Sequence, residues 1–356
     1  MLKVSGAEPS DESNIMKTKN SIKPGKTQRQ TATPAAPPKL QKILTTTDFS
    51  DDSRAGVRYA AALAEKLKAD VALLHVVEPR SWMDQYGARK DSEAVALASA
   101  QLATLAKREV GGDVTVTSSV RTGKPFHEIT TAAREGAADL IVIATHGHTG
   151  VERVLLGITA ERVVRHAPCP VLVVPTRELP KRAGKAPPFQ LKKILVPIDF
   201  SNHSKDALPY AVLLAGHYNA ELVLLHIVEK FPIDYLLGPE LMNQTAVPVM
   251  KQAGADLERM ARELGEASSV KATAVVRDGN PFEEICQSAK TVGADLVVLT
   301  THGYTGLKLA WLGSTAERVV RHAHCPVLVV RAHKHVSSPK ERAPQRRGRE
   351  RNHENQ

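Results

Sequence analysis

Cysteines, long apolar segments and an apolar leader are scarce or missing in this chain of 356 residues. Its three cysteines are too few, and of the wrong parity, for a disulfide framework, so we expect a reducing, cytoplasmic setting. Apolar runs such as Leu140–Ala144 and Val327–Val330 fall far short of the roughly 20 helical residues that cross a bilayer. Because no apolar stretch follows the charges near the N-terminus, we predict neither a secretory signal nor a membrane partner.

The two most familiar phosphate-binding motifs are also missing. The Gly25–Thr27 tripeptide is not a Walker A motif, because Asn20 stands where a glycine is needed and no strand precedes it. No Gly-x-Gly-x-x-Gly turn follows the first predicted strand. These absences exclude a P-loop and the common dinucleotide fingerprint.

Positive charge is concentrated in three segments. Residues 1–42, 176–193 and 332–356 together carry a net charge of +14, against +10 for the whole chain. A nucleic-acid-binding fold places its basic patch on a structured face, so the high net charge is weak support for such a fold. We interpret these segments as solvated tails, 1–38 and 332–356, and a linker, 176–190. Weak contact of the tails with nucleic acid is the alternative.

The chain contains one domain twice. Residues 147–175 and 303–331 are identical at 20 of 29 positions, at an offset of 156 residues. Nearer the start of each copy the offset is 151 residues, so the second copy holds a net insertion of five residues between them. A period near 150 residues is too long for a solenoid repeat and indicates a duplicated domain. We place the two domains at 39–175 and 191–331.

Each copy alternates strand and helix patterns. In the first, the predicted strands are 42–47, 70–77, 113–120, 140–144 and 170–174, and the predicted helices are 53–67, 92–110, 125–134 and 157–166. The strands are rich in Val, Ile and Leu, as is typical of parallel strands covered on both faces. The order predicts an α/β fold with a doubly wound, open parallel sheet in each domain. Such folds bind ligands at the carboxyl ends of the strands.

An aspartate follows the first strand of each copy, Asp48 in one and Asp199 in the other. A carboxylate at this edge is placed to hydrogen-bond a ribose or an adenine. The alternative is a cap for the following helix. Ser50 or Ser201 could also serve as that cap, so the aspartate is not needed for it.

Glycine and hydroxyl residues follow the fourth strand of each copy. The segments are Thr145–Gly150 and Thr301–Gly306, and a further glycine, Gly157 or Gly313, stands where the last helix begins. Glycine permits close backbone approach, and a helix start offers unpaired N–H groups that favour phosphate. Two structural turns built from glycine and threonine are the alternative.

These residues resemble the universal stress protein family. The resemblance spans both copies and includes Ala-Glu-Arg-Val-Val-Arg-His-Ala followed by Cys-Pro-Val-Leu-Val-Val. The ATP-binding branch has a signature of Gly, two residues, Gly, nine residues, Gly, then Ser or Thr. Gly303, Gly313 and Ser314 match it, while Thr300 replaces the leading glycine. In the first copy Ala144 replaces that glycine.

The resemblance implies tandem Rossmann-like domains of the adenine nucleotide alpha hydrolase-like type, which bind ATP with Mg²⁺ held by the phosphates. It also implies an intramolecular pseudo-dimer through the last strands, and a homodimer is left open. The aspartates would lie by the adenosine, Ile227 or Val76 would pack on the base, and the glycine segments would line the phosphates. The preferred nucleotide site, in the second domain, comprises Pro197, Asp199, Ile227, His302, Gly303, Gly313, Ser314 and Thr315. The weaker one comprises Asp48, Val76, His146, Gly147, Gly157 and Thr159.

The departures from the signature rank the two sites. In the first copy, Ile158 stands where the signature has Ser or Thr, and Thr46 occupies the position that is Pro197 in the second copy. Loss of one neutral hydrogen bond costs roughly 1 kcal/mol, and an unpaired charged oxygen costs roughly 1.5–3 kcal/mol. We therefore expect the second site to bind ATP more tightly, by about one or two orders of magnitude.

No acid–base pair or nucleophile constellation indicates an enzyme, although His302 beside a phosphate could support slow hydrolysis. The alternatives to a nucleotide-binding stress-response or signalling module are an interaction scaffold with empty sites and a slow, partner-coupled ATPase. We do not predict a metal site at His322, His324 and Cys325, with His333 and His335, because the first copy keeps only two of these residues. His75 and His226 are interpreted as hydrogen-bonded core histidines.

Overall fold

The structure is a computed structural model, and it describes residues 38–79, 87–145, 156–175, 190–229, 239–301 and 313–331. In the helices that begin at Gly87 and Pro239, side chains are described from Ser92 and Val247 onward. Except for residues 38 and 190, the expected tails and linker lie outside this part of the chain. Both repeats belong to one compact unit, residues 37–356.

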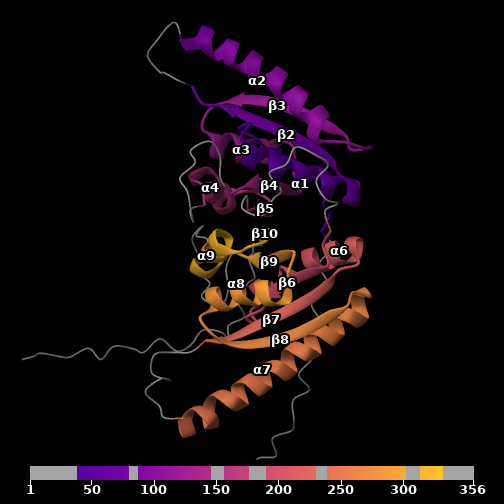
Figure 1. Ribbon diagram of the computed structural model, residues 1–356, viewed down its shortest axis with the longest axis vertical. Coiled ribbons are helices and arrows are strands. Elements are labelled where there is room, and N and C mark those ends of the chain that lie inside the picture. The colour runs from indigo at the N-terminus through magenta and orange to yellow at the C-terminus, as the bar shows by residue number, and fades with distance from the viewer. Residues whose placement is uncertain are drawn as a thin grey trace, which may run out of the picture. The chain divides into compact units, whose positions relative to one another are not determined.

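The helices and strands alternate as the sequence predicts (Figure 1). The first repeat contains β1 (Lys42–Thr46), α1 (Asp51–Leu67), β2 (Asp70–Val77), α2 (Gly87–Glu109), β3 (Val116–Thr122), α3 (Pro125–Glu135), β4 (Leu140–Ala144), α4 (Ile158–His166) and β5 (Val171–Val174). The second contains β6 (Lys193–Pro197), α5 (Asn202–Lys205), α6 (Leu208–Tyr218), β7 (Glu221–Glu229), α7 (Pro239–Ser268), β8 (Ala272–Gly279), α8 (Pro281–Val292), β9 (Leu296–Thr300), α9 (Ser314–His322) and β10 (Val327–Val330).

The strands form one ten-stranded sheet in the order β3-β2-β1-β4-β5-β10-β9-β6-β7-β8. All pairs within a repeat are parallel, and β5 and β10 pair antiparallel, with Leu172 opposite Leu328. In the first repeat, β2 and β3 follow on one side of β1, and β4 and β5 lie on the other, so the strand order reverses direction between β1 and β4. In the second repeat it reverses between β6 and β9. Such a switch point leaves a crevice at the carboxyl ends of the two strands. The predicted doubly wound α/β fold is confirmed.

Local sequence explains where these elements begin. Ser50 caps α1 by accepting a hydrogen bond from the Ser53 N–H, with Asp51 and Asp52 in the first turn. Two predicted starts were wrong: α2 begins at Gly87, five residues earlier than expected, and β3 begins at Val116, three residues later than expected. A turn at Gly112, whose φ is 73°, occupies the start of the expected strand.

The second repeat departs from the first in two helices. Its counterpart of α1 is split into α5 and α6, because Pro209 supplies no N–H and is tolerated only in a first helical turn. The insertion in the second repeat coincides with a longer helix, since α7 has 30 residues and α2 has 23.

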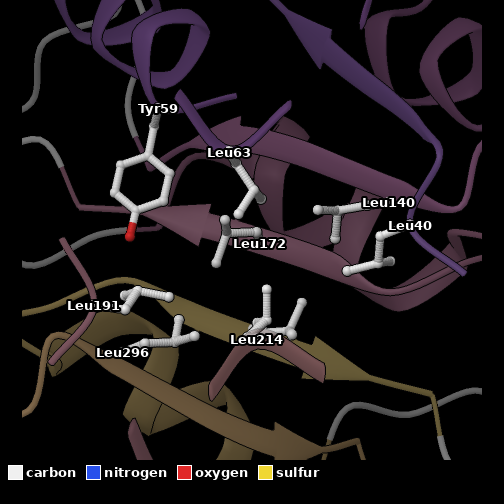
Figure 2. A pocket seen from close by; sticks show the side chains of 9 residues that line it. Leu40, Tyr59, Leu63, Leu140, Leu172, Leu191, Leu214 and Leu296 are labelled. Carbon is white, nitrogen blue, oxygen red and sulfur yellow. The ribbon is translucent and has the colours of Figure 1, made fainter. Parts of the chain in front are cut away.

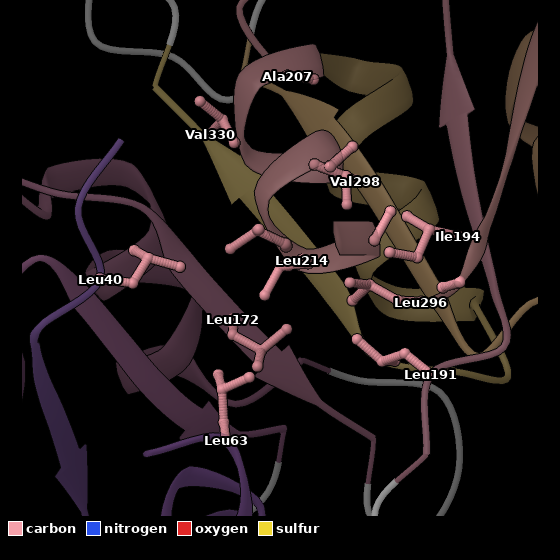
Figure 3. Packing of buried hydrophobic residues seen from close by; sticks show 14 of the residues in the cluster. Leu40, Leu63, Leu172, Leu191, Ile194, Ala207, Leu214, Leu296, Val298 and Val330 are labelled. Atoms are coloured by element: carbon pink, nitrogen blue, oxygen red, sulfur yellow. The ribbon is translucent and has the colours of Figure 1, made fainter. Parts of the chain in front are cut away.

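Two apolar layers sandwich the sheet. Side chains of α1, α6 and α7 pack on one face, and those of α3, α4, α8 and α9 pack on the other. Figure 3 shows Leu63, Leu172 and Leu214 of the first layer, in which both repeats share one continuous core. Burying each such leucine stabilises the fold by about 1.5–3 kcal/mol.

The repeats meet along β5 and β10, as the family resemblance implied. On one side of this seam, a small apolar cavity is lined by Tyr59 and by leucines of both repeats, which point toward one another in Figure 2. On the other side, Arg321 of α9 bonds Glu161 of α4 at 3.1 Å and Glu317 at 2.7 Å. Arg165 of α4 bonds Glu161 at 2.9 Å.

Within the described segments, no helix is long and apolar enough to span a membrane.

Candidate functional site

The two aspartates lie in matching turns at the carboxyl ends of β1 and β6. Oδ1 of Asp48 accepts the Ser50 N–H at 3.1 Å, and Oδ1 of Asp199 accepts the Ser201 N–H at 3.0 Å. The serines are the helix caps, since their hydroxyls accept N–H bonds from Ser53 and Ser204. Each aspartate therefore fixes the capping serine without being the cap itself, and both carboxylates are half-buried.

Each aspartate is followed by a phenylalanine in the left-handed region, a feature that the sequence analysis missed. Phe49 has φ 65° and Phe200 has φ 63°, values that are uncommon for a bulky residue. Their rings lie 4.4 and 4.5 Å from the rings of His75 and His226. Strained backbone of this kind persists where the surroundings hold it in place, and it is frequent at functional sites.

The histidines complete this support. Nδ1 of His75 lies 2.8 Å from the Thr47 carbonyl, and Nδ1 of His226 lies 2.7 Å from the Ile198 carbonyl. Because a carbonyl only accepts, Nδ1 is the donor in both bonds. The expectation that these histidines are hydrogen-bonded is confirmed, although both are half-buried rather than buried.

The first repeat stabilises its aspartate loop with additional hydroxyl bonds. Thr47 Oγ1 lies 2.9 Å from Ser53 Oγ and accepts the Phe49 N–H at 2.9 Å. In the second repeat Ile198 replaces Thr47, so this pair of bonds cannot form. The Thr47 bonds are therefore particular to the first repeat.

Pro197 ends β6 at the switch point of the second repeat. Pairing between β1 and β4 continues to Thr45, whereas pairing between β6 and β9 stops at Leu195, one position earlier. A proline has no N–H to donate to a neighbouring strand, and it is therefore tolerated where the pairing ends. The hydrogen-bonded pairing of β6 with β9 therefore ends one residue earlier than that of β1 with β4.

Gly157 and Gly313 fix the starts of α4 and α9 against the sheet. Each glycine N–H donates to the carbonyl of Thr145 or Thr301 at 2.8 Å. A Cβ added at either glycine would lie 3.0 Å from that carbonyl oxygen, so a larger residue would push the helix start away. Each helix has a glycine as its N-cap residue, so among the described residues no N-cap side chain caps it, and the first-turn N–H groups follow the carboxyl edge of the sheet.

The residue after each glycine distinguishes the two helix starts. Ile158 is 73% exposed, and the corresponding Ser314 is also exposed. Thr159 and Thr315 follow, and both are half-buried. The second helix start therefore offers two neighbouring hydroxyls, whereas the first offers one hydroxyl and an apolar side chain.

The remaining expected residues are placed only in part. Val76 and Ile227 lie near the carboxyl ends of β2 and β7, half-buried against the layer that contains α4 and α9. His146, Gly147, His302 and Gly303 lie outside the described residues.

The cysteines and histidines do not form a second centre in the described segments, where no cluster of three His, Cys, Asp or Glu side chains could hold a metal. Burial raises the pKa of Cys169 to about 12, and Asp139 adds to the effect. Burial also raises the pKa of Cys286. These thiols are protonated near neutral pH and are poor nucleophiles.

The fold and the edge define a class of protein: tandem doubly wound α/β domains with aspartate loops and uncapped helix starts at matching switch points. The model of the universal stress protein family matches residues 39–175 and 190–331, so the chain belongs to this family, whose members act in the stress response.

Individual relatives agree with this assignment. A universal stress protein of Methanocaldococcus jannaschii is 36% identical over 143 residues, covering 39% of this chain and 82% of that protein. One of Mycobacterium tuberculosis is 28% identical over 305 residues, covering 83% of this chain and 98% of that protein. The crystal structure of a universal stress protein from Archaeoglobus fulgidus covers 83% of this chain and 98% of its own, with 21% identity and a TM-score of 0.61. That likeness supports the fold.

Proposed function

We propose that this universal stress protein binds ATP, with Mg²⁺ held by the phosphates, and that it serves as a stress-response or signalling module. The observation that carries the proposal is the start of α9, whose N-cap residue Gly313 has no side chain to cap it and which follows β9, the strand beside the one that leads to Asp199. The N–H groups and positive dipole end of a helix start favour a phosphate.

The described residues would contact the nucleotide at its two ends, the triphosphate and the adenosine. Ser314 and Thr315, at the start of α9, would donate to phosphate oxygens. Asp199, beyond the end of β6, would accept hydrogen bonds from the ribose hydroxyls or the adenine amino group, because a carboxylate only accepts. Ile227, on β7, would pack against the base.

The second domain holds the better site in this proposal. The exposed Ile158 offers no hydrogen bond where Ser314 offers a hydroxyl. Loss of one hydroxyl donor costs roughly 1–3 kcal/mol, depending on the charge of its partner. That corresponds to about one or two orders of magnitude in affinity.

Calorimetric titration of the full chain with ATP and Mg²⁺ tests the proposal. We expect one tight site per chain, a loss of about tenfold in its affinity in Ser314→Ile, and an unchanged tight site in the matched control Ile158→Ser. A folded chain that gives no binding heat at millimolar ATP would refute nucleotide binding and favour the interaction scaffold. Steady release of phosphate above the buffer blank would favour the slow ATPase.

A further inference from the structure

Two arginines occupy corresponding positions near the carboxyl ends of the outermost strands. Arg121 of β3 lies in register beside Val76 of β2, and Arg277 of β8 lies in register beside Ile227 of β7. Neighbouring strands are about 4.8 Å apart, and residues in register share a face of the sheet. Each arginine therefore stands next to the residue expected to pack on the base.

The face that carries Arg277 is the one covered by α8 and α9. Side chains alternate along a strand, so Arg277 shares its face with Val275, which packs in the layer beneath those helices. Ile227 packs in the same layer. Arg277 follows the last apolar residue of this face and marks its carboxyl edge.

In the first repeat, acidic residues of α3 hold the arginine. Arg121 bonds Glu135 at 2.6 Å and lies 3.7 Å from Glu128, and its side chain is 29% exposed. A guanidinium paired in this way has few donors left for a ligand.

In the second repeat, the main partner is missing. Thr291 stands where the first repeat has Glu135, and its hydroxyl donates within its own helix to the Gln287 carbonyl. Arg277 is exposed and forms no ion pair with any residue that the structure describes. The side chain can therefore turn toward a ligand on β7 without breaking an ion pair.

We propose that Arg277 is a further binding residue of the nucleotide site in the second domain and that it contacts the adenosine end. The inference rests on the proposed function. A guanidinium has five donors and a planar face, so it suits the acceptor nitrogens of a purine and can stack on its ring. Because β8 is three strands from β9, about 14 Å, the arginine contacts the base or ribose and not the triphosphate.

The test compares ATP with inorganic tripolyphosphate in calorimetric titrations of the full chain. We expect Arg277→Gln to weaken ATP binding about tenfold and to leave tripolyphosphate binding unchanged. The matched control Arg121→Gln should change neither affinity. Thr291→Glu, which restores the carboxylate of the first repeat, should weaken ATP binding without altering Arg277.

Three results would overturn the inference. Unchanged ATP affinity in Arg277→Gln would refute it while leaving the proposed function intact. An equal loss for ATP and tripolyphosphate would show a general effect on the site and would also refute it. Absence of ATP binding in the unaltered chain would refute the proposed function, and the role of Arg277 with it.

Discussion

The two repeats share the arrangement of their cores and differ at their carboxyl edges. Both contribute a matching leucine to the seam, Leu172 and Leu328, and both keep the strained phenylalanine beside a histidine. At the edge, the first repeat has a Thr47–Ser53 bond and an Arg121–Glu135 pair. The second repeat has neither. Packing constrains both copies alike, whereas the polar pairs at the edge differ between them.

Because the two cores are similar, truncation of a matching leucine in each repeat should lower the free energy of unfolding by the same amount. This is the largest effect that we expect. Leu172→Ala and Leu328→Ala each remove a buried side chain, 3% and 1% exposed, at the seam between the repeats. Each should lower the free energy of unfolding by about 2–5 kcal/mol, as leucine-to-alanine changes in cores do.

Urea unfolding of the two single variants measures these costs. The double variant should cost a different amount from the sum, because the two residues face each other across β5 and β10. A difference above about 1 kcal/mol between the single variants would break the comparison, since it would show that one repeat dominates the shared core.

A smaller effect should separate the two aspartate loops. His226→Leu and His75→Leu each remove one bond to a backbone carbonyl and one ring contact with a phenylalanine. We expect a loss of about 1–2 kcal/mol of stability in each. The loss should be larger for His226→Leu, because the loop of the first repeat keeps its Thr47 hydroxyl bonds.

Unfolding midpoints and ATP affinity together check this prediction. The His226 variant should also bind ATP more weakly, while the His75 variant should keep the affinity of the tight site. If His75→Leu were the more damaging change to both quantities, the proposed ranking of the loops would be wrong.

Most of the fold could be predicted from the sequence because its signals are local and repeated. The Val-rich strands, the Ser50 cap and the matching second copy all point to the same doubly wound arrangement. The starts of α2 and β3 were the main errors. For β3, the apolar pattern of the strand gives no sign of how far the Gly112 turn extends.

The edge was predicted less completely, for two physical reasons. A left-handed phenylalanine has no sequence signature, since glycine and asparagine are the usual residues there, so Phe49 and Phe200 passed unnoticed. The pairing of Arg121 with Glu135 depends on how α3 packs along β3, which composition does not reveal. Alignment of the two copies places Thr291 at the position of Glu135, and this difference could have indicated that Arg121 and Arg277 have different partners.

Placing a carboxylate at the start of α9 tests the central claim most directly, because helix stability and phosphate binding respond in opposite directions. Ser314→Asp should stabilise the helix by about 0.3–1 kcal/mol and should weaken ATP binding at least about tenfold through charge repulsion. Ile158→Asp should give the same stabilisation and leave the tight site unchanged. If ATP bound equally well to the Ser314→Asp protein, the start of α9 would not hold the triphosphate, and the account would be contradicted.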